Sequence, residues 1–273
     1  MKRSFTDQIG HTVDIESPPQ RIVSLVPSQT ELLAYLGLDN EVAGITKFCI
    51  HPDKWFRTKT RVGGTKNVTF SKIDSINPDL IICNKEENTE SEVKALMEKY
   101  PVWTSDIRKL GDALNMIKSV GEITNKKAES QKLAAQIKSN FEEFSRNKLK
   151  HLRVVYLIWK DPIMAAGKDT FIDDMLNQCN FSNVCEASLG RYPELSMEQI
   201  KKLAPQVILL SSEPYPFREK HTEEFMGYFP DALPVLVDGE YYSWYGSRLL
   251  YAPQYLKSVI DQLYLNGNNS IKV

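Results

Sequence analysis

The feature of this sequence that most constrains its fold is a helix–turn–strand pattern that occurs twice. The stretch FSKIDSINPDLIICN begins at Phe70, and the stretch MEQIKKLAPQVILL begins at Met197. Four positions recur with identical spacing 127 residues later: Ile73, Ile76, Pro78 and Leu80 return as Ile200, Leu203, Pro205 and Val207. Each copy is typical of a short helix, a turn at proline and a buried strand. The shared frame favours a structural duplication over the alternative that two α/β units merely look alike.

Short β-branched runs alternate with helical patterns in both halves of the chain. The run RIVSLV at 21–26 precedes the helical pattern PSQTELLAYLGL, and the similar run RVVYLIW at 153–159 begins the second half. Strands that alternate with helices are typical of parallel sheets. A chain of 273 residues is long for one domain and suits two. We therefore expect an α/β fold of two Rossmann-like lobes with parallel sheets, one over 1–108 and the other over 151–273.

The region between the lobes, 109–150, is predicted to be a single long α-helix. Its apolar residues recur mostly at helical spacing, and its later part is rich in Lys, Glu, Gln and Ala and has no proline. An interruption is expected, if anywhere, near Gly121 to Asn125. A helical connector of this kind permits small movements of the lobes but not a wide flexible hinge.

Charge and hydropathy argue against nucleic-acid binding and against a membrane span. The formal net charge is −1, whereas a broad nucleic-acid-binding face needs a basic excess. No apolar stretch approaches the ~20 residues that a membrane-spanning helix needs. The first residues are partly basic but lack the apolar run of a signal peptide. Two origins stay open: a periplasmic or surface-anchored protein whose leader was removed, and a cytoplasmic protein with Met1 as its native start.

Cysteines and catalytic motifs give little support for a metal centre or an enzyme. The four cysteines, Cys49, Cys83, Cys179 and Cys185, form no CxxC pair. Cys179 and Cys185 could pair with each other, and free thiols are an equal alternative. The chain has no G-x-S-x-G, P-loop or H-E-x-x-H motif. We expect no catalytic residue and no intrinsic cofactor, with an enzyme as the minor alternative.

Several stretches of the chain resemble one family over about residues 10–265. RIVSLVPSQTELLAYLGL, RVGGTKN, IDSINPDLIICNKEEN and MEQIKKLAPQVILL are similar to stretches in the substrate-binding proteins of ABC importers for cobalamin, haem and ferric siderophores, and most similar to the cobalamin-binding members. The resemblance implies the helical-backbone class of periplasmic binding protein (class III), in which one long helix joins two lobes and the ligand lies in the cleft between them. It also implies that each lobe docks on a membrane permease through an acidic residue, here Glu90 and Glu198. Acids that merely complement a helix dipole are the alternative for both.

Aromatic residues near the ends of predicted strands are the candidates for ligand contact. Ligands of α/β lobes bind beyond the carboxyl ends of the strands, and a large flat ligand needs aromatic walls. The stretch EYYSWYGSR at 240–248 is the strongest case, because four aromatic residues in one loop are difficult to bury together. The resemblance adds Pro27 and places Asn84 where the family has an aromatic residue. The complete predicted set is Pro27, Phe48, His51, Trp103, Trp159, Tyr192, Tyr241, Tyr242 and Trp244.

His51, in the stretch FCIHP, is the candidate metal ligand. A neutral imidazole could ligate the cobalt or iron of a chelate, and Cys49 lies two residues before it. A histidine that caps the loop before Pro52 is the alternative. Arg248 is expected to pair with Glu240 on the surface rather than with a ligand carboxylate.

The predicted function is binding of a small-molecule metal chelate, a corrinoid such as cobalamin, by a monomer that has an ABC permease as its partner if it is exported. A ferric siderophore or haem is the alternative ligand. Siderophores usually call for cleft arginines, of which only Arg61, Arg191 and Arg248 are candidates. A bare metal ion would need a cluster of His and carboxylates from both lobes, which four scattered histidines do not supply. A cytoplasmic corrinoid-handling protein, or an enzyme that acts on a corrinoid, is the alternative without a permease.

Overall fold

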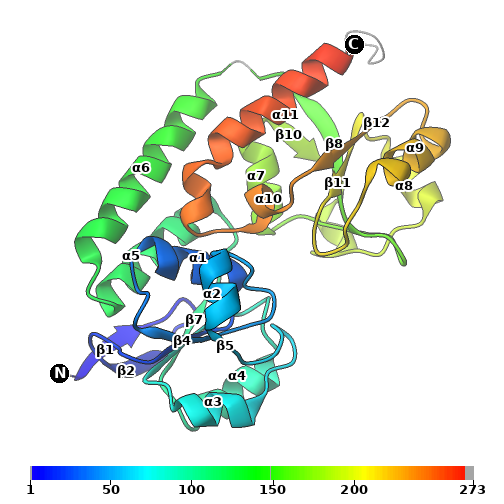
Figure 1. The fold of residues 1–273 in the computed structure, drawn as a ribbon. Coiled ribbons are helices and arrows are strands. Elements are labelled where there is room, and N and C mark those ends of the chain that lie inside the picture. The colour runs from blue at the N-terminus through cyan, green and yellow to red at the C-terminus, as the bar shows by residue number, and fades with distance from the viewer. Residues whose placement is uncertain (1, 148, 268–273) are drawn as a thin grey trace. The chain divides into compact units, whose positions relative to one another are not determined.

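The computed structural model describes residues 2–147 and 149–267, and the chain divides into two compact units. Unit 1 consists of Met1–Ile107, Gly111–Lys138 and Trp244–Arg248, and unit 2 consists of Arg108–Leu110, Ser139–Ser243 and Leu249–Val273. Figure 1 labels the elements of both. The short segment 244–248 therefore belongs to unit 1, although the residues on either side of it belong to unit 2.

Unit 1 is built on a parallel sheet with the strand order β5-β4-β3-β6-β7. The strands are β3 (Ile22–Ser24), β4 (Val42–Ile45), β5 (Thr60–Arg61), β6 (Leu80–Asn84) and β7 (Val102–Ser105). The helices between them are α1 (Pro27–Tyr35), α2 (Asp53–Thr58), α3 (Phe70–Ile76) and α4 (Glu90–Met97). β6 is buried along its whole length, which is typical of a parallel strand covered on both faces.

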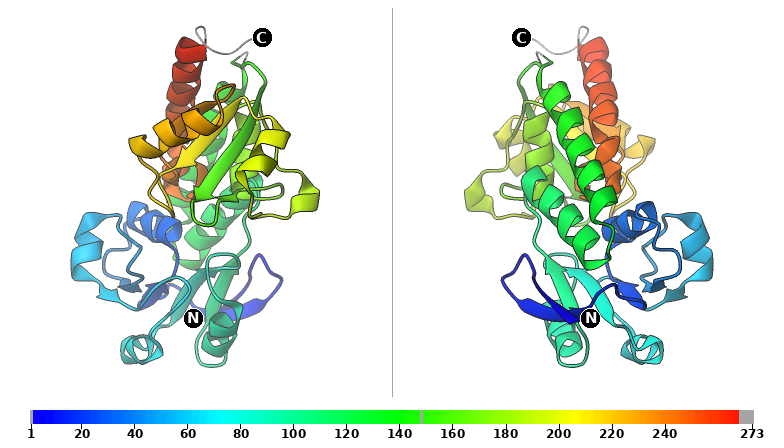
Figure 2. Two further views of the ribbon diagram at one scale, coloured as in Figure 1. Left: turned by 90° about the vertical axis from the view of Figure 1, so that its right-hand side faces the viewer. Right: turned by 90° about the vertical axis from the view of Figure 1, so that its left-hand side faces the viewer.

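An antiparallel hairpin of β1 (Lys2–Thr6) and β2 (Thr12–Glu16) precedes this sheet. Its turn is bonded to β7: the backbone N–H of Gln8 donates to the carbonyl of Thr104 (3.1 Å), and the N–H of Thr104 donates to a carboxylate oxygen of Asp7 (3.2 Å). Figure 2 shows the hairpin, in dark blue, beside the sheet. The hairpin thus covers an edge strand that would otherwise expose unpaired backbone groups.

Unit 2 has a parallel sheet with the strand order β10-β8-β11-β12, and β9 pairs with β8 antiparallel. Its strands are β8 (Leu152–Trp159), β9 (Met164–Ala165), β10 (Phe181–Asn183), β11 (Val207–Ser211) and β12 (Leu233–Val237). Its helices are α7 (Phe171–Gln178), α8 (Met197–Leu203), α9 (Glu219–Tyr228), α10 (Glu240–Ser243) and α11 (Ala252–Gly267), with a short 3-10 turn at Ala187–Leu189. A further 3-10 turn, Ser247–Leu250, begins in the unit 1 segment 244–248. The predicted α/β class with two parallel sheets is confirmed.

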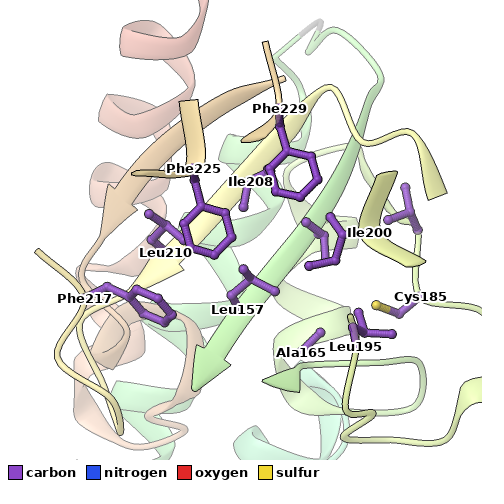
Figure 3. Packing of buried hydrophobic residues seen from close by; sticks show 12 residues of the cluster. Leu157, Ala165, Cys185, Leu195, Ile200, Ile208, Leu210, Phe217, Phe225 and Phe229 are labelled. Carbon is purple, nitrogen blue, oxygen red and sulfur yellow. The ribbon is translucent and has the colours of Figure 1, made fainter. Parts of the chain in front are cut away.

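The hydrophobic core on one face of the unit 2 sheet is drawn in Figure 3. Phe225 and Phe229, on and just after α9, lie over Ile208 and Leu210 of β11, and the two phenyl rings stack with their centroids 5.9 Å apart. Ile200 of α8 packs into the same cluster and is fully buried. Burial of a side chain of this size contributes about 1.5–3 kcal/mol to stability. The apolar positions shared by the two sequence copies therefore serve as core residues.

The two copies of the helix–turn–strand pattern also have the same backbone structure. α3 ends at Asn77 (φ 48°) and α8 ends at Ala204 (φ 45°), each in the left-handed region and each followed by proline. In unit 1 the Arg21 side chain donates to the carbonyl of Asn77 (2.8 Å), and in unit 2 the Arg153 side chain donates to the carbonyl of Ala204 (3.3 Å). These matching bonds agree with the predicted duplication.

The region predicted as one connecting helix contains two helices, α5 (Leu110–Ile123) and α6 (Lys127–Ser145). The break lies at Asn125, whose φ of 58° is left-handed and ends α5. A Cβ on Gly121 would lie 1.9 Å from the Ser130 hydroxyl, so only glycine allows α5 and α6 to approach this closely. None of the described helices is both long enough and apolar enough to cross a membrane.

Candidate functional site

The carboxyl ends of the parallel strands in each unit carry most of the predicted ligand-binding residues. In unit 1 the connections after β3, β4 and β6 begin at residues 25, 46 and 85. The connections after β8, β10, β11 and β12 begin at residues 160, 184, 212 and 238. Loops at this end of a parallel sheet are the usual place for ligand contacts.

The connection after β6 is held by two asparagines that sequence reasoning did not select for this purpose. The Asn84 side-chain oxygen accepts the N–H groups of Glu86 (2.8 Å) and Glu87 (3.1 Å). The Asn88 side-chain oxygen in turn accepts the N–H of Asn84 (2.8 Å), and its amide donates to the carbonyl of Leu25 (3.2 Å). Asn84, expected as a substitute for an aromatic wall, is therefore a buried turn-forming residue.

The connection after β4 presents one aromatic side chain to solvent and buries its cysteine. Phe48 is 50% exposed. Cys49 is fully buried, with its sulfur 3.1 Å from the hydroxyls of both Thr30 and Thr46, and burial raises the pKa of its thiol. Cys49 is therefore a core thiol and not a second metal ligand beside His51. The half-buried His51 ring meets the Trp244 ring edge-on, with their centroids 5.6 Å apart.

Two predicted contacts of unit 1 lie in its interior. Trp103 is a residue of β7 and only 1% exposed, and its indole N–H has no hydrogen-bond partner in the described part of the chain. Pro27 is buried at the first position of α1, where the missing N–H of proline costs nothing. Neither side chain offers an open surface to a ligand in this structure.

In unit 2, Trp159 is one of two predicted aromatic residues that are exposed. It ends β8, is 39% exposed, and its indole N–H donates to the carbonyl of Asp161 (3.2 Å). Its ring meets the ring of Tyr215 edge-on at 5.7 Å. Tyr215 follows β11 in the stretch SSEPYPF, and sequence reasoning missed it; an aromatic residue after a strand was the signal that could have found it.

The remaining tyrosines of the predicted set differ from one another in exposure. Tyr192 lies after β10 and is 40% exposed, with the guanidinium of Arg191 5.9 Å from its ring centre. Tyr241 is half-buried and stacks on Tyr255 at 4.3 Å. Tyr242 is fully buried among Tyr156 and other core groups, and burial raises the pKa of its phenol well above the ordinary value. Tyr242 is therefore a core residue in this structure, not part of an open aromatic wall.

The loop stretch EYYSWYGSR is divided between the two units. Its first part forms α10 in unit 2, and its second part, residues 244–248, belongs to unit 1. Two guanidinium nitrogens of Arg248 donate to Glu31 of α1, at 2.6 Å and 3.2 Å, a pairing that the sequence did not predict. The expected pairing with Glu240 stays a prediction. The bidentate geometry strengthens the ion pair with Glu31.

Both candidate docking acids are exposed residues in the first turn of a helix. Glu90 begins α4 and forms an i,i+4 ion pair with Lys94 (2.6 Å), whose hydrogen bond lowers the pKa of the Glu90 carboxyl. Glu198 lies in α8, behind the capping residue Ser196. In the repeated frame Glu198 corresponds to Ser71 of α3, so Glu90 and Glu198 are not equivalent residues of the two units.

The four cysteines and the potential metal ligands can be placed directly. All four thiols are free and buried, so Cys179 and Cys185 are not bonded to each other. Among the described residues there is no group of three or more His, Cys, Asp or Glu side chains that could hold a metal ion.

Residues 22–232 match the sequence model of the periplasmic binding protein family. An uncharacterised ABC transporter substrate-binding lipoprotein of Bacillus subtilis is 28% identical over 216 residues, which are 76% of this chain and 68% of that protein. The periplasmic vitamin B12-binding protein of Vibrio cholerae has a similar fold, with a TM-score of 0.76 at 20% identity over 90% of this chain and 98% of that one. A periplasmic haem-binding protein of Pseudomonas aeruginosa gives a TM-score of 0.77 at 18% identity, over 89% of this chain and 92% of that one. Because the family model matches most of its length, the chain belongs to the periplasmic binding protein family and is a substrate-binding protein of ABC transport rather than an enzyme.

Proposed function

We propose that this chain binds a corrinoid, such as cobalamin, or a related metal chelate, and presents it to an ABC permease. The observation that carries the proposal is the exposure of Phe48, Trp159 and Tyr192 at the carboxyl ends of the strands. Exposed rings at that end of each sheet suit a large flat ligand, which buries apolar area against them. The fold shared with the vitamin B12-binding protein of Vibrio cholerae supports the corrinoid as the first ligand to test.

Titration followed by visible absorption tests the ligand class. Purified protein is titrated with aquocobalamin, cobinamide, haem and a ferric siderophore, and saturable binding of a corrinoid is expected. The proposal fails if no chelate binds more tightly than ~100 μM, which corresponds to a binding free energy of only ~5.5 kcal/mol.

The same titration tests His51 as an axial ligand. A shift of the aquocobalamin spectrum that is lost in His51→Ala would assign the imidazole to cobalt. Saturable binding with the same spectrum in both proteins would leave His51 as a residue that packs against Trp244.

Haem is the second candidate ligand. The observation in its favour is the exposure of Tyr192, which is 40%, because tyrosine phenolates ligate haem iron. Tyr192→Phe is then expected to alter the haem spectrum and to leave corrinoid binding within about threefold, since the ring is retained. Tyr228→Phe, an exposed tyrosine on α9, is the matched control.

We also propose that Glu90 and Glu198 dock on the permease from outside the cytoplasmic membrane, with the protein as a monomer. Their exposure in helix first turns supports the proposal, and the name of the Bacillus subtilis relative, a lipoprotein, supports the location. Charge reversal at each position should reduce ligand uptake in cells with the cognate permease while ligand binding in solution is unchanged. Glu129→Lys, in the first turn of α6, is the control. Unimpaired uptake by the double variant would refute docking through these acids.

A further inference from the structure

Residues 244–248, called the strap from here on, enter unit 1 from flanks that belong to unit 2. Every strap residue is buried or half-buried, with Trp244 at 6%, Tyr245 at 5% and Ser247 at 3% exposure. A five-residue segment cannot supply a core of its own, so its place in unit 1 must come from specific contacts. These contacts involve the connections after β3, β4 and β6.

The first contact is with α1, which follows β3. Arg248 forms a bidentate ion pair with Glu31, and only 13% of its side chain and 22% of that of Glu31 are exposed. The same guanidinium lies 4.8 Å from the centre of the Trp244 ring. Arg248 therefore sets the position of Trp244 as well as that of the strap backbone, because a planar guanidinium can pair with a carboxylate and stack on an indole together.

The second contact reaches the connection after β4. The Trp244 ring meets His51 edge-on at 5.6 Å, so the indole limits the orientations that the imidazole can adopt. The order of contacts is Glu31, Arg248, Trp244 and His51.

The third contact reaches the connection after β6. The Tyr245 hydroxyl donates to a carboxylate oxygen of Glu87 at 2.5 Å. The backbone N–H of Glu87 is in turn held by Asn84. Tyr245 therefore adds a bond from the strap to a turn that the asparagines already order.

Gly246 allows the strap to lie this close to α1. A Cβ built on Gly246 would be 2.4 Å from the carbonyl oxygen of Ser28, a backbone atom that cannot move aside cheaply. Glycine is required here for close approach, not for an unusual φ.

We propose that the strap is a positioning element for the ligand-binding loops of unit 1, with Arg248 and Glu31 orienting Trp244 and His51, and Tyr245 orienting Glu87. This rests on the proposed function, since it assigns the strap to the same ligand site. The strap does not itself supply an exposed aromatic surface; it fixes the geometry of the unit 1 loops, one of which carries the exposed Phe48. A displacement of about 1 Å in a preorganised loop is enough to weaken recognition of the ligand by up to about a hundredfold.

Hydrogen–deuterium exchange of the ligand-free protein and ligand titration are measured on the same variants. Arg248→Met should raise exchange in 46–52 and lower chelate affinity about tenfold or more. Tyr245→Phe removes one hydroxyl and should raise exchange in 84–89 while leaving 46–52 unchanged. Arg57→Met is the matched control, because Arg57 pairs with Asp53 in unit 1 but on an exposed helix face. Arg248→Lys keeps the charge but loses the bidentate pair, and should fall between wild type and Arg248→Met.

The outcomes separate this proposal from the proposed function. If wild type binds a chelate, and Arg248→Met folds with wild-type exchange in 46–52 or wild-type affinity, the strap has no positioning role. If Arg248→Met does not fold, Arg248→Lys decides by the same two readouts, and Tyr245→Phe decides by exchange in 84–89, where a wild-type level would refute positioning by the strap. If wild type binds none of the chelates, the proposed function fails and the ligand role of the strap fails with it, whereas the exchange data still show whether the strap orders the loops.

Discussion

Asn77 and Ala204 occupy the same position at the ends of two helices, and both have left-handed backbone, with φ of 48° and 45°. Each is followed by proline and, after one further residue, by an interior strand of a sheet. Asparagine tolerates this conformation through its short polar side chain, whereas alanine does so only with strain. The duplicated turn is therefore imposed by the fold even where the residue is unfavourable.

Replacement of the strained alanine should stabilise unit 2. Ala204→Gly removes the Cβ clash of the left-handed region and should raise the free energy of unfolding by about 0.5–1 kcal/mol after the greater entropy of unfolded glycine is subtracted. Urea denaturation measures the change in the free energy of unfolding, and the m-value should be unchanged. Ala95→Gly, within α4, is expected to lower stability by about 1 kcal/mol, and equal effects of both changes would refute the explanation.

The turn after β6 depends on the Asn84 side chain. Asn84→Ala leaves the N–H groups of Glu86 and Glu87 without their acceptor and should lower the free energy of unfolding by about 2 kcal/mol. Thermal and urea unfolding measure the loss. The exposed Asn40→Ala is the control and should stay within about 0.5 kcal/mol of wild type. A wild-type stability for Asn84→Ala would show that water replaces this bond without loss.

Trp159 should contribute directly to chelate affinity if the proposed function holds. Trp159→Ala removes an exposed ring at the end of β8, and affinity should fall about 10- to 100-fold, or about 1.5–3 kcal/mol. Isothermal titration calorimetry of the variant and of wild type, with a chelate that wild type binds, measures the change in affinity. Tyr228→Ala, an exposed aromatic residue on α9, should bind as wild type. An equal loss in both variants would indicate a general effect on unit 2.

His221 should make stability depend on pH in the mildly acidic range. Burial, and then the neighbouring Lys160 and Lys220, lower the pKa of His221, whose ring nitrogen accepts the N–H of Arg218 (2.9 Å), while Glu224 opposes the shift. The unfolded chain, with an ordinary His pKa of about 6.5, then binds a proton more readily than the folded chain. Stability should therefore be complete above about pH 6.5 and fall as the pH drops below it.

Urea midpoints of wild type and His221→Phe between pH 7.5 and 5.5 test this. The variant keeps an aromatic ring among Tyr215 and Phe217 and should have a smaller loss at low pH. Parallel curves for the two proteins would show that His221 does not cause the dependence.

Local patterns were sufficient for most elements of the fold. The sequence predicted the apolar strands β6 and β11 and the helices before them. Apolar runs and helical periodicity are patterns of residues that are close together in the sequence. The break between α5 and α6 was located only approximately. Asn125, in the left-handed conformation, ends α5. The close approach of Gly121 to Ser130 depends on how α5 and α6 pack against each other, which local patterns do not predict.

The candidate site was less predictable, because aromatic residues on loops look alike in sequence. Trp159 and Tyr192 are exposed as expected, but Trp103 and Tyr242 are core side chains. Tyr215 was missed although it contacts Trp159.

The sequence by itself determined the α/β class, the duplicated unit and the family, since these depend on periodicity and on motifs that extend over most of the chain. Only the tertiary structure decided the partner of Arg248, which is Glu31 at a separation of 217 residues, and the division of EYYSWYGSR between two units. Such contacts form between residues far apart in the sequence, and they depend on which surfaces pack together after the strands have paired. Neither residue spacing nor composition predicts that packing.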